Sequence, residues 1–307
     1  LVMSFGVQIQ NDNHNGYSDP LSVEFQSYYF ANLYKISIVN NGFGCAIFNY
    51  NDYRAQKPIL STRSINDPIS TSGVVYVYGK TKSSFNVLKS LFNDEREPII
   101  DIGNYSTTVY IFIIVSFIIL IIFLYIFSRF KRFQEYFTRA ALRPFNFYSD
   151  IRDQRILSPS YTYIIGIFNS LSFGLFAESF AYFYRTNEAF GYLMNLIIPS
   201  ITVQKYIYNI IWMPAVGIVV FSIFFLICLF IISLLIKLFA YFKHLRIHSF
   251  DTISIVNWGS LPFLYLLPID VLLHRLLQID LIFSTIFLIF AALVLISSIF
   301  RILRATA

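Results

Sequence analysis

The chain has 307 residues with a formal net charge of +6, and 56% of its residues are hydrophobic while only 13% are charged. An ordinary soluble domain is about 25% charged, and a soluble globule with this composition would expose large apolar patches. The composition therefore excludes a typical soluble domain and favours a membrane protein.

The first third of the chain differs from the rest. Residues 1–104 carry 8 Lys and Arg against 9 Asp and Glu, a net of −1, whereas the remainder carries 15 against 8, a net of +7. This shift predicts a domain boundary near Asn104. Short β-branched or aromatic runs separated by turn residues predict strands, and SSFNVLKSLF predicts one short helix at 83–92. The predicted strands lie at 21–26, 33–39, 44–50 and 73–79.

We therefore expect residues 1–104 to form a small β-rich domain, a β-sandwich. Tyrosines exposed on such a sheet would suit a glycan or a protein partner. The alternative is that these tyrosines are ordinary half-buried strand residues, and this alternative is favoured. Cys45 and Cys228 predict no disulfide framework, since the second lies in an apolar run.

Five later segments are long and apolar enough to cross a membrane, which takes about 20 residues in a helix. Pro214 is expected to mark where an interfacial lead-in becomes the third span. The fourth span is broken by Gly259, Pro262 and Pro268, so neighbouring helices must satisfy the freed backbone carbonyls, and we expect a kinked span inside the bundle. Residues 189–204 are predicted to be a re-entrant or interfacial piece. The predicted spans are 105–128, 161–184, 206–236, 252–269 and 281–300.

Lys and Arg orient these spans, because positively charged loops stay in the cytoplasm. The loop 129–155 holds 7 of them, and with the first 104 residues outside, the inner side receives twelve and the outer side three. The N-terminal domain is therefore expected outside the cytoplasm and the C-terminus inside.

The basic loop itself predicts an amphipathic helix ended by Pro144, with an irregular loop over 144–155. Phe130, Phe133 and Phe137 recur at helical spacing, and we expect them to dip into the acyl boundary. The cations would then face anionic lipid headgroups at about 1 kcal/mol each. An alternative of equal weight is that these basic residues only stop the transfer of the chain through the membrane and have no binding partner. The predicted headgroup residues are Arg129, Lys131, Arg132, Arg139 and Arg143.

The membrane half resembles the bacterial Yip-domain family, which is related to the Ypt/Rab-interacting membrane proteins. The resemblance covers roughly residues 143–304. It rests on the loop LRPFNFYSDIRDQR, a Gly-containing span, the entry WMPAVG, and LLIKLFAYFKHLRIHSFDTISIVNWGSLPFLYLLPIDVLL. It implies a four-helix Yip-like membrane domain over 156–307 and a multi-pass scaffold, which in eukaryotes engages small GTPases in vesicle traffic. Ala240-Tyr241-Phe242 stands where the family more commonly has Gly-Gly.

Motifs for catalysis are not found: the sequence has no phosphate-binding Gly-rich loop, no His-Glu-x-x-His and no paired-cysteine zinc pattern. His244 and His248 are four residues apart, but their basic neighbours favour a basic inner surface over a metal site. We predict no enzyme activity, no cofactor, no metal and no nucleic-acid partner.

Ionisable side chains near predicted spans are candidates for function. The favoured interpretation is structural: these groups lie at the outer interface, where a carboxylate pairs with Arg185 or Arg275. A proton or ion relay is the alternative. Asn169 and Asn257 are expected to make hydrogen bonds between helices, and Pro214, Gly259 and Pro262 to break or pack helices. The ionisable candidates are Glu178, Asp270, His274 and Arg275.

Together these features predict a non-enzymatic scaffold of membrane organisation or protein trafficking in a bacterial inner membrane. A small permease or ion-coupled transporter is the first alternative. A transmembrane sensor, whose outside domain binds a ligand and signals to the amphipathic helix, is the second.

Overall fold

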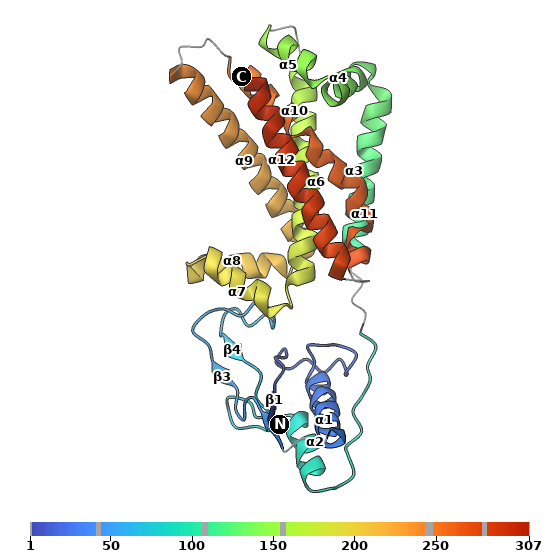
Figure 1. Cartoon of the computed structure of the whole chain (residues 1–307), viewed down its shortest axis with the longest axis vertical. Coiled ribbons are helices and arrows are strands. Elements are labelled where there is room, and N and C mark those ends of the chain that lie inside the picture. The colour runs from blue at the N-terminus through green and yellow to red at the C-terminus, as the bar shows by residue number, and fades with distance from the viewer. Residues whose placement is uncertain are drawn as a thin grey trace. The chain divides into compact units, whose positions relative to one another are not determined.

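The computed structural model describes residues 2–40, 44–105, 110–153, 158–242, 248–277 and 281–306. The chain divides into two compact units (Figure 1). The N-terminal unit comprises Leu1–Thr108 together with Tyr184–Trp212, and the membrane unit comprises Val109–Phe183 together with Met213–Ala307. The N-terminal unit is therefore discontinuous in sequence.

The N-terminal unit contains short strands and four helices in its described part. Strand β1 pairs in parallel with β2 from Val2–Gly44 to Phe5–Ile47, and β3 pairs antiparallel with β4. Helix α2 confirms the predicted short helix, and β2 lies within the predicted strand at 44–50. The elements are β1 (Val2–Phe5), α1 (Val23–Val39), β2 (Gly44–Ile47), β3 (Tyr53–Arg54), β4 (Ile69–Ser70), α2 (Ser83–Phe92), α7 (Glu188–Ile197) and α8 (Ile201–Ile211).

The predicted β-sandwich is not confirmed, because α1 replaces two of its strands, 21–26 and 33–39. The segment 73–79 forms only isolated bridges through Val75. The helix starts where the Ser22 hydroxyl accepts a hydrogen bond from the amide of Phe25, an ordinary N-cap. Its buried face includes the polar side chains Gln26 and Ser27, so a search for apolar periodicity does not reveal it.

Within the residues that the structure describes, the membrane unit has five helices long and apolar enough to cross a membrane, which confirms the predicted multi-pass character. These are Tyr110–Arg129, Pro159–Tyr184, Pro214–Phe242, Ser249–Leu273 and Ile282–Thr306. As predicted, the third begins at Pro214. The elements of this unit are α3 (Tyr110–Arg129), α4 (Lys131–Leu142), α5 (Pro144–Arg152), α6 (Pro159–Tyr184), α9 (Pro214–Phe242), α10 (Ser249–Gly259), the 3-10 helix η1 (Leu261–Tyr265), α11 (Leu266–Leu277) and α12 (Leu281–Thr306).

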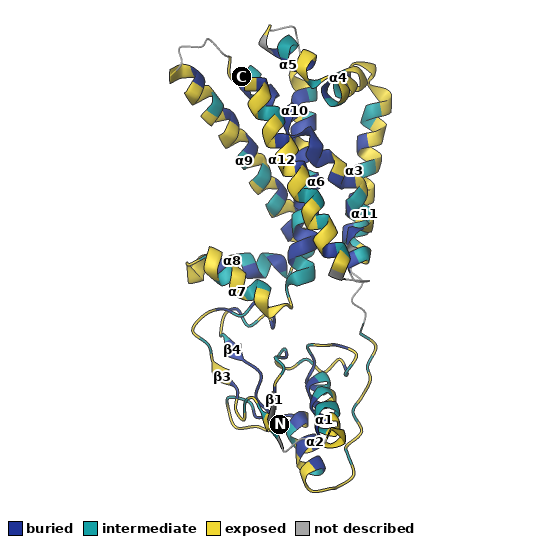
Figure 2. Ribbon diagram, viewed as in Figure 1, coloured by how far each residue is buried: buried dark blue, intermediate teal, exposed yellow. Residues whose placement is uncertain are grey.

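Helix α6 and the broken span formed by α10, η1 and α11 make the centre of the membrane unit (Figure 2). Each is 72% buried over its most apolar window, whereas the other three candidate spans are 17%, 22% and 11% buried. Contacts between aromatic rings join α6 to its neighbours. The ring centre of Phe168 lies 5.3 Å from that of Phe123 of α3, and the ring centre of Phe173 lies 4.2 Å from that of Phe225 of α9. The outer helices leave large apolar faces for lipid.

The basic loop folds differently from the prediction in two respects. Helix α4 forms and ends before Pro144, but Phe133 is completely buried in the core of the membrane unit, against Tyr161 and Trp258, instead of facing lipid. The segment predicted to be an irregular loop forms helix α5 over Pro144–Arg152, with Pro144 in its first turn, where a missing amide hydrogen costs nothing. Asp150 of α5 forms an ion pair with Arg139 of α4.

Side chains of α6 satisfy the backbone where the fourth span is broken, as predicted. The Asn169 amide donates to the carbonyl of Asn257 at 2.9 Å and to the Ser260 hydroxyl at 2.9 Å. The Ser172 hydroxyl donates to the carbonyl of Phe263 at 2.8 Å. The break is therefore held by a neighbouring helix.

Replacing Asn169 with leucine should cost the membrane unit about 1–2 kcal/mol, because the Asn257 carbonyl and Ser260 hydroxyl would each lose a buried donor. Reversible unfolding in mixed micelles measures this loss. Ser170→Ala is the matched control, since the buried Ser170 hydroxyl bonds only to Gly166 of its own helix. Equal stability of the two variants would contradict the proposed role of Asn169.

Gly174 allows α6 and α9 to approach closely. A methyl group at Gly174 would lie 2.1 Å from the hydroxyl oxygen and 2.7 Å from the backbone nitrogen of Ser222. Gly174→Ala should therefore lower the free energy of unfolding by about 1–3 kcal/mol through overpacking. In Gly191→Ala, the control, the nearest atom is Leu60 Cβ at 3.9 Å, and the same unfolding measurement should show no loss.

Candidate functional site

A polar cavity of about 480 Å³ lies within the N-terminal unit. This volume falls in the range of about 300–1,000 Å³ that is typical of small-molecule sites, although such sites are usually more apolar. The lining residues are Gln10, Asn11, Thr62, Arg63, Ser64, Ile65, Asn66, Asp67, Thr71 and Asn209. Nine of these ten side chains can form hydrogen bonds, so the cavity suits a polar occupant.

The loop 62–67 supplies most of the lining, and its own hydrogen bonds fix its shape. The amide of Ile59 donates to the carbonyl of Ser64 at 2.9 Å, and that of Arg63 donates to the carbonyl of Leu60 at 3.1 Å. The Ser64 hydroxyl bridges the carbonyl of Asp67 and the amide of Ile69, each at 2.8 Å. Arg63 has a φ of +57°, a left-handed conformation that is uncommon outside glycine and often found at functional sites.

Two threonines form the buried polar part of the lining. Thr62 and Thr71 are 3% and 1% exposed, respectively. The Thr71 hydroxyl oxygen accepts a hydrogen bond from the amide of Ile9 at 3.1 Å and donates to its carbonyl. The Thr62 hydroxyl has no hydrogen-bond partner among the residues that the structure describes. A buried hydroxyl in that state is expected to bond to water or to a ligand.

The outer part of the lining carries charge of both signs. Arg63, Asn66 and Asp67 are exposed. The guanidinium group offers donors in a fixed planar arrangement, and the Asp67 carboxylate is an acceptor. Together with the threonines, these groups can recognise a small molecule that both donates and accepts hydrogen bonds.

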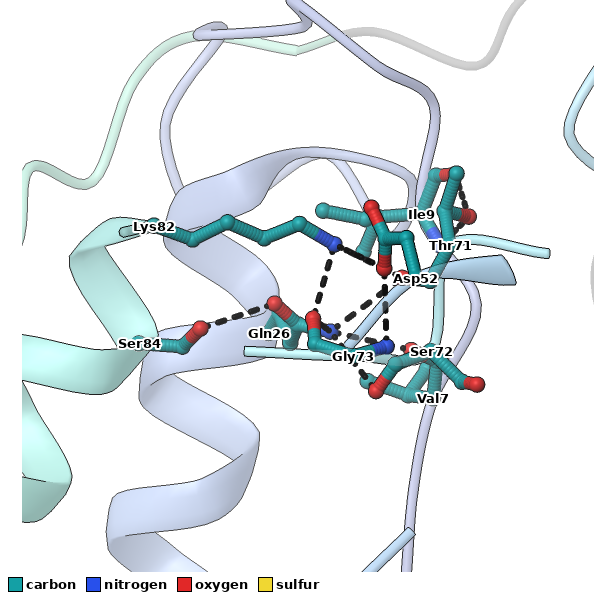
Figure 3. A network of polar contacts seen from close by, with 9 residues as sticks. All are labelled: Val7, Ile9, Gln26, Asp52, Thr71, Ser72, Gly73, Lys82 and Ser84. Carbon is teal, nitrogen blue, oxygen red and sulfur yellow. Dashed lines mark hydrogen bonds and ion pairs between the residues drawn. The ribbon is translucent and has the colours of Figure 1, made fainter. Parts of the chain in front are cut away.

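A buried ion pair positions the Thr71 wall of the cavity (Figure 3). The Lys82 ammonium lies 2.8 Å from Asp52 and donates to the carbonyls of Thr71 at 3.0 Å and Gly73 at 2.7 Å. Asp52 in turn accepts a hydrogen bond from the amide of Gly73 at 2.9 Å. Both charged side chains are inaccessible to solvent. Residues 71–73 are thus held by a lysine that lies just before α2.

Gln26 of α1 also contacts this strip, and it reaches all three residues, 71–73. Its amide nitrogen lies 3.3–3.4 Å from the carbonyl oxygens of Val7 and of residues 71–73, and its carbonyl oxygen accepts a hydrogen bond from Ser84 at 2.9 Å. Figure 3 shows Gln26 and Lys82 converging on this strip. The buried polar face of α1, which the apolar pattern did not reveal, therefore serves to position the cavity wall.

Burial dominates the electrostatics of the ion pair. Desolvation raises the pKa of Asp52 above its ordinary value, and the hydrogen bond and charge of Lys82 offset part of that increase. Desolvation likewise lowers the pKa of Lys82, and Asp52 opposes the decrease. Each charge is therefore retained because the other is present.

Trp212 connects the cavity loop to the ends of two membrane helices along the chain. Its indole nitrogen donates to the carbonyl of Leu60 at 3.0 Å, and the guanidinium carbons of Arg63 and Arg185 lie 5.8 Å and 4.8 Å from its ring centre. Arg185 directly follows the last residue of α6, and Trp212 precedes the first residue of α9 by two positions. The sequence patterns singled out neither Trp212 nor Arg63; the WMPAVG motif was noted for its proline and for the resemblance to the Yip-domain family.

Two of the predicted ionisable candidates, Glu178 and Asp270, are more completely buried than expected. Glu178 and Asp270 are 0% and 1% exposed in the membrane unit, and a methyl group at Gly217 would lie 2.2 Å from the Glu178 carboxyl carbon. Neither Asp270 oxygen has a hydrogen-bond partner among the described residues, and Arg275 is exposed. The pairing of a carboxylate with Arg185 or Arg275 stays a prediction. Helix α11 continues through both Asp270 and His274. The His274 side chain and His244 lie outside what the structure describes.

The five predicted headgroup residues are all exposed, on α4 and beside its two ends. Their exposure is compatible with lipid binding, which stays a prediction. No cluster of three potential metal ligands is present in the described part of the chain.

Comparisons with models of protein families, with curated proteins and with solved structures give no match for this chain. The resemblance to the Yip-domain family therefore stays a prediction.

Proposed function

We propose that this protein is a non-enzymatic transmembrane sensor whose N-terminal unit binds a small polar solute. The observation that carries this proposal is the cavity of about 480 Å³ with its buried, unpartnered Thr62 hydroxyl. A buried hydroxyl without a protein partner is expected to bond to water or to a ligand, and this one borders the cavity. The Lys82 and Gln26 contacts that fix the opposite wall support the same conclusion, because binding sites need preorganised polar groups.

The chemistry of the lining suggests the class of ligand. Arg63 and Asp67 offer one charge of each sign, and the threonine and asparagine side chains offer both donors and acceptors. These groups suit a zwitterion or a polyhydroxy compound, such as a free amino acid or a monosaccharide. They do not favour a strongly apolar ligand or a polyanion.

Trp212 provides a route for the signal. Arg63 both lines the cavity and lies over the Trp212 ring, so a ligand that draws the guanidinium group inward would alter its contact with a residue close to α9. The sensor function thus needs no large movement of the N-terminal unit. It needs only a change in one cation–π contact, which contributes about 0.5–2 kcal/mol.

Hydrogen exchange of the full-length protein in lipid nanodiscs tests the proposal, with a panel of free amino acids and monosaccharides as probes. At least one probe should slow amide exchange in residues 59–71. Thr62→Val should weaken that binding about three- to tenfold, because a single neutral hydrogen bond contributes about 0.5–1.5 kcal/mol. Thr138→Val, at an exposed threonine of α4, is the matched control and should leave binding unchanged. The proposal fails if no probe protects the loop, or if Thr62→Val binds as well as the parent protein.

An ion-coupled transporter is the second candidate, and the burial of Asp270 favours it. A carboxylate at membrane depth is costly and marks functional sites in transporters. Solute flux in reconstituted vesicles that is lost in Asp270→Asn would support transport. The scaffold role expected from the Yip resemblance predicts instead stable protein partners that co-purify from native membranes, with no dependence on either Thr62 or Asp270.

A further inference from the structure

Helices α7 and α8 form a hairpin with its own internal contacts. The two helices are separated by residues 198–200, which include Pro199. The Tyr208 hydroxyl donates to the side-chain oxygen of Asn195 at 2.9 Å, and the Gln204 amide donates to the carbonyl of Ile198. Gln204 and Tyr208 are completely buried. The hairpin is therefore a defined structural element with an inner, polar face.

The opposite face of the hairpin is apolar and exposed. Leu196 is 82% exposed, and the stretch 189–204 contains no charged residue. On α7 the large exposed apolar residues fall at i, i+1, i+4 and i+5, which places them on one side of the helix; Glu188, at the first position of the helix, is also exposed. A soluble protein rarely leaves such a patch uncovered. The large exposed apolar side chains are Tyr192, Leu193, Leu196, Ile197, Ile201, Val203 and Tyr206.

The chain attaches both ends of this hairpin to membrane helices through very short links. Residues 185–187 separate α6 from α7, and residues 212–213 separate α8 from α9. At about 3.6 Å per residue, the ends of the hairpin lie within ~15 Å of the ends of the two spans. The headgroup region on each side of the hydrocarbon core is itself about 5–8 Å thick. An element tethered this closely at both ends cannot leave the neighbourhood of the bilayer surface.

We infer that the α7–α8 hairpin lies in the plane of the membrane, with its apolar face in the leaflet where α6 ends at Tyr184. Lipid is a better occupant for this face than a second copy of the chain, because both tethers hold it at the bilayer. Tyr192, Tyr206 and Trp212 are also the residue types enriched at membrane interfaces. Of the two alternatives that the sequence left open, this selects the interfacial helix over the re-entrant one.

The hairpin also contacts the rest of the N-terminal unit. Besides the bond from Trp212 to Leu60, the Lys205 ammonium lies 3.5 Å from the carbonyl of Asn66, and Asn209 lines the cavity. The hairpin thus has two faces with different tasks. One inserts into lipid, and the other forms part of the polar unit.

Lipid-quenching fluorescence on the full-length protein tests this inference. A bimane label is placed at Leu196→Cys in a Cys45→Ala, Cys228→Ala background, in nanodiscs with nitroxide-labelled lipid. The matched control is Tyr78→Cys, at a residue 81% exposed in the same unit. Lipid nitroxide should quench the Leu196 label at least twofold more than the Tyr78 label, and aqueous iodide should give the opposite order. Tyr206→Cys provides a second position on the same face.

Two results would overturn the inference. Equal quenching of the Leu196 and Tyr78 labels by iodide would place the hairpin in water. Disulfide-linked dimers through Leu196→Cys, together with protection from the lipid nitroxide, would show that a second copy covers this face. Neither result bears on solute binding in the cavity, so the two proposals can fail separately.

Discussion

Lys82→Met is expected to destabilise the N-terminal unit by about 3–5 kcal/mol. The substitution keeps most of the length of the side chain but leaves Asp52 as an uncompensated buried charge, which is the costly way to break such a pair. It also removes a donor from the carbonyls of Thr71 and Gly73. Hydrogen exchange of the α1 and α2 amides in the full-length protein measures the free energy of opening of this unit.

Lys35→Met is the matched control for this experiment. Lys35 lies 2.8 Å from Glu97, but both side chains of this pair are partly exposed. Exposed ion pairs contribute only about 0–1 kcal/mol. A similar loss in the two variants would show that burial of the Lys82–Asp52 pair is not the cause.

The loss in Lys82→Met should depend on pH, with a predictable sign. Without Lys82, only desolvation and the Gly73 amide act on Asp52, so the pKa of its carboxyl rises further above its unfolded value. A group whose folded pKa is raised stabilises the fold at low pH, and this contribution is lost as pH rises through the folded pKa. The variant should therefore recover stability relative to the parent protein as pH is lowered toward 4. A deficit that stays constant over this range would contradict the assignment.

Trp258→Ala is expected to cost the membrane unit about 3–5 kcal/mol, the usual effect of removing a large buried aromatic side chain. Trp258 is completely buried in α10, with ring contacts to Phe133 of α4 and Phe147 of α5 at 6.3 Å and 5.1 Å. Its loss should therefore also loosen α4 and α5 from the bundle. Unfolding in mixed micelles measures the global loss, and protease accessibility of residues 129–152 measures the local one.

Trp258→Phe separates the two roles of this side chain. It keeps most of the apolar volume but removes the hydrogen bond from the indole nitrogen to the Thr162 hydroxyl at 3.2 Å, so an intermediate loss is expected. Leu142→Ala, at an exposed position of α4, should cost little. Unchanged protease accessibility in Trp258→Ala would show that α4 and α5 are held by other contacts.

The membrane helices could be predicted from the sequence because length and apolarity decide whether a helix can span a bilayer, and both can be read from a single continuous segment of the chain. The broken fourth span was predictable for a related reason. Pro262 and Gly259 cannot be accommodated in lipid without partners, and Asn169 was the kind of residue able to provide them.

The N-terminal unit was harder to predict because polar side chains organise it. The buried face of α1 includes Gln26 and Ser27, so its apolar residues do not show a clear helical period. The cavity was also hard to predict from the sequence. Its lining comes from segments far apart in the chain, and Asn209 lies more than 130 positions beyond Thr71. No local pattern reports that such segments meet.

Because residues 184–212 belong to the N-terminal unit, that unit cannot be completed early during synthesis. Two candidate membrane helices, α3 and α6, are translated between its two parts and must be placed before Asn209 can close the cavity and Trp212 can bond to Leu60. A ribosome-bound chain ending near residue 108 would thus hold an open, ligand-incompetent half. The proposed solute site would be complete only after the first two candidate spans have been inserted, so solute binding, if it occurs as proposed, would report that this late step of assembly has taken place.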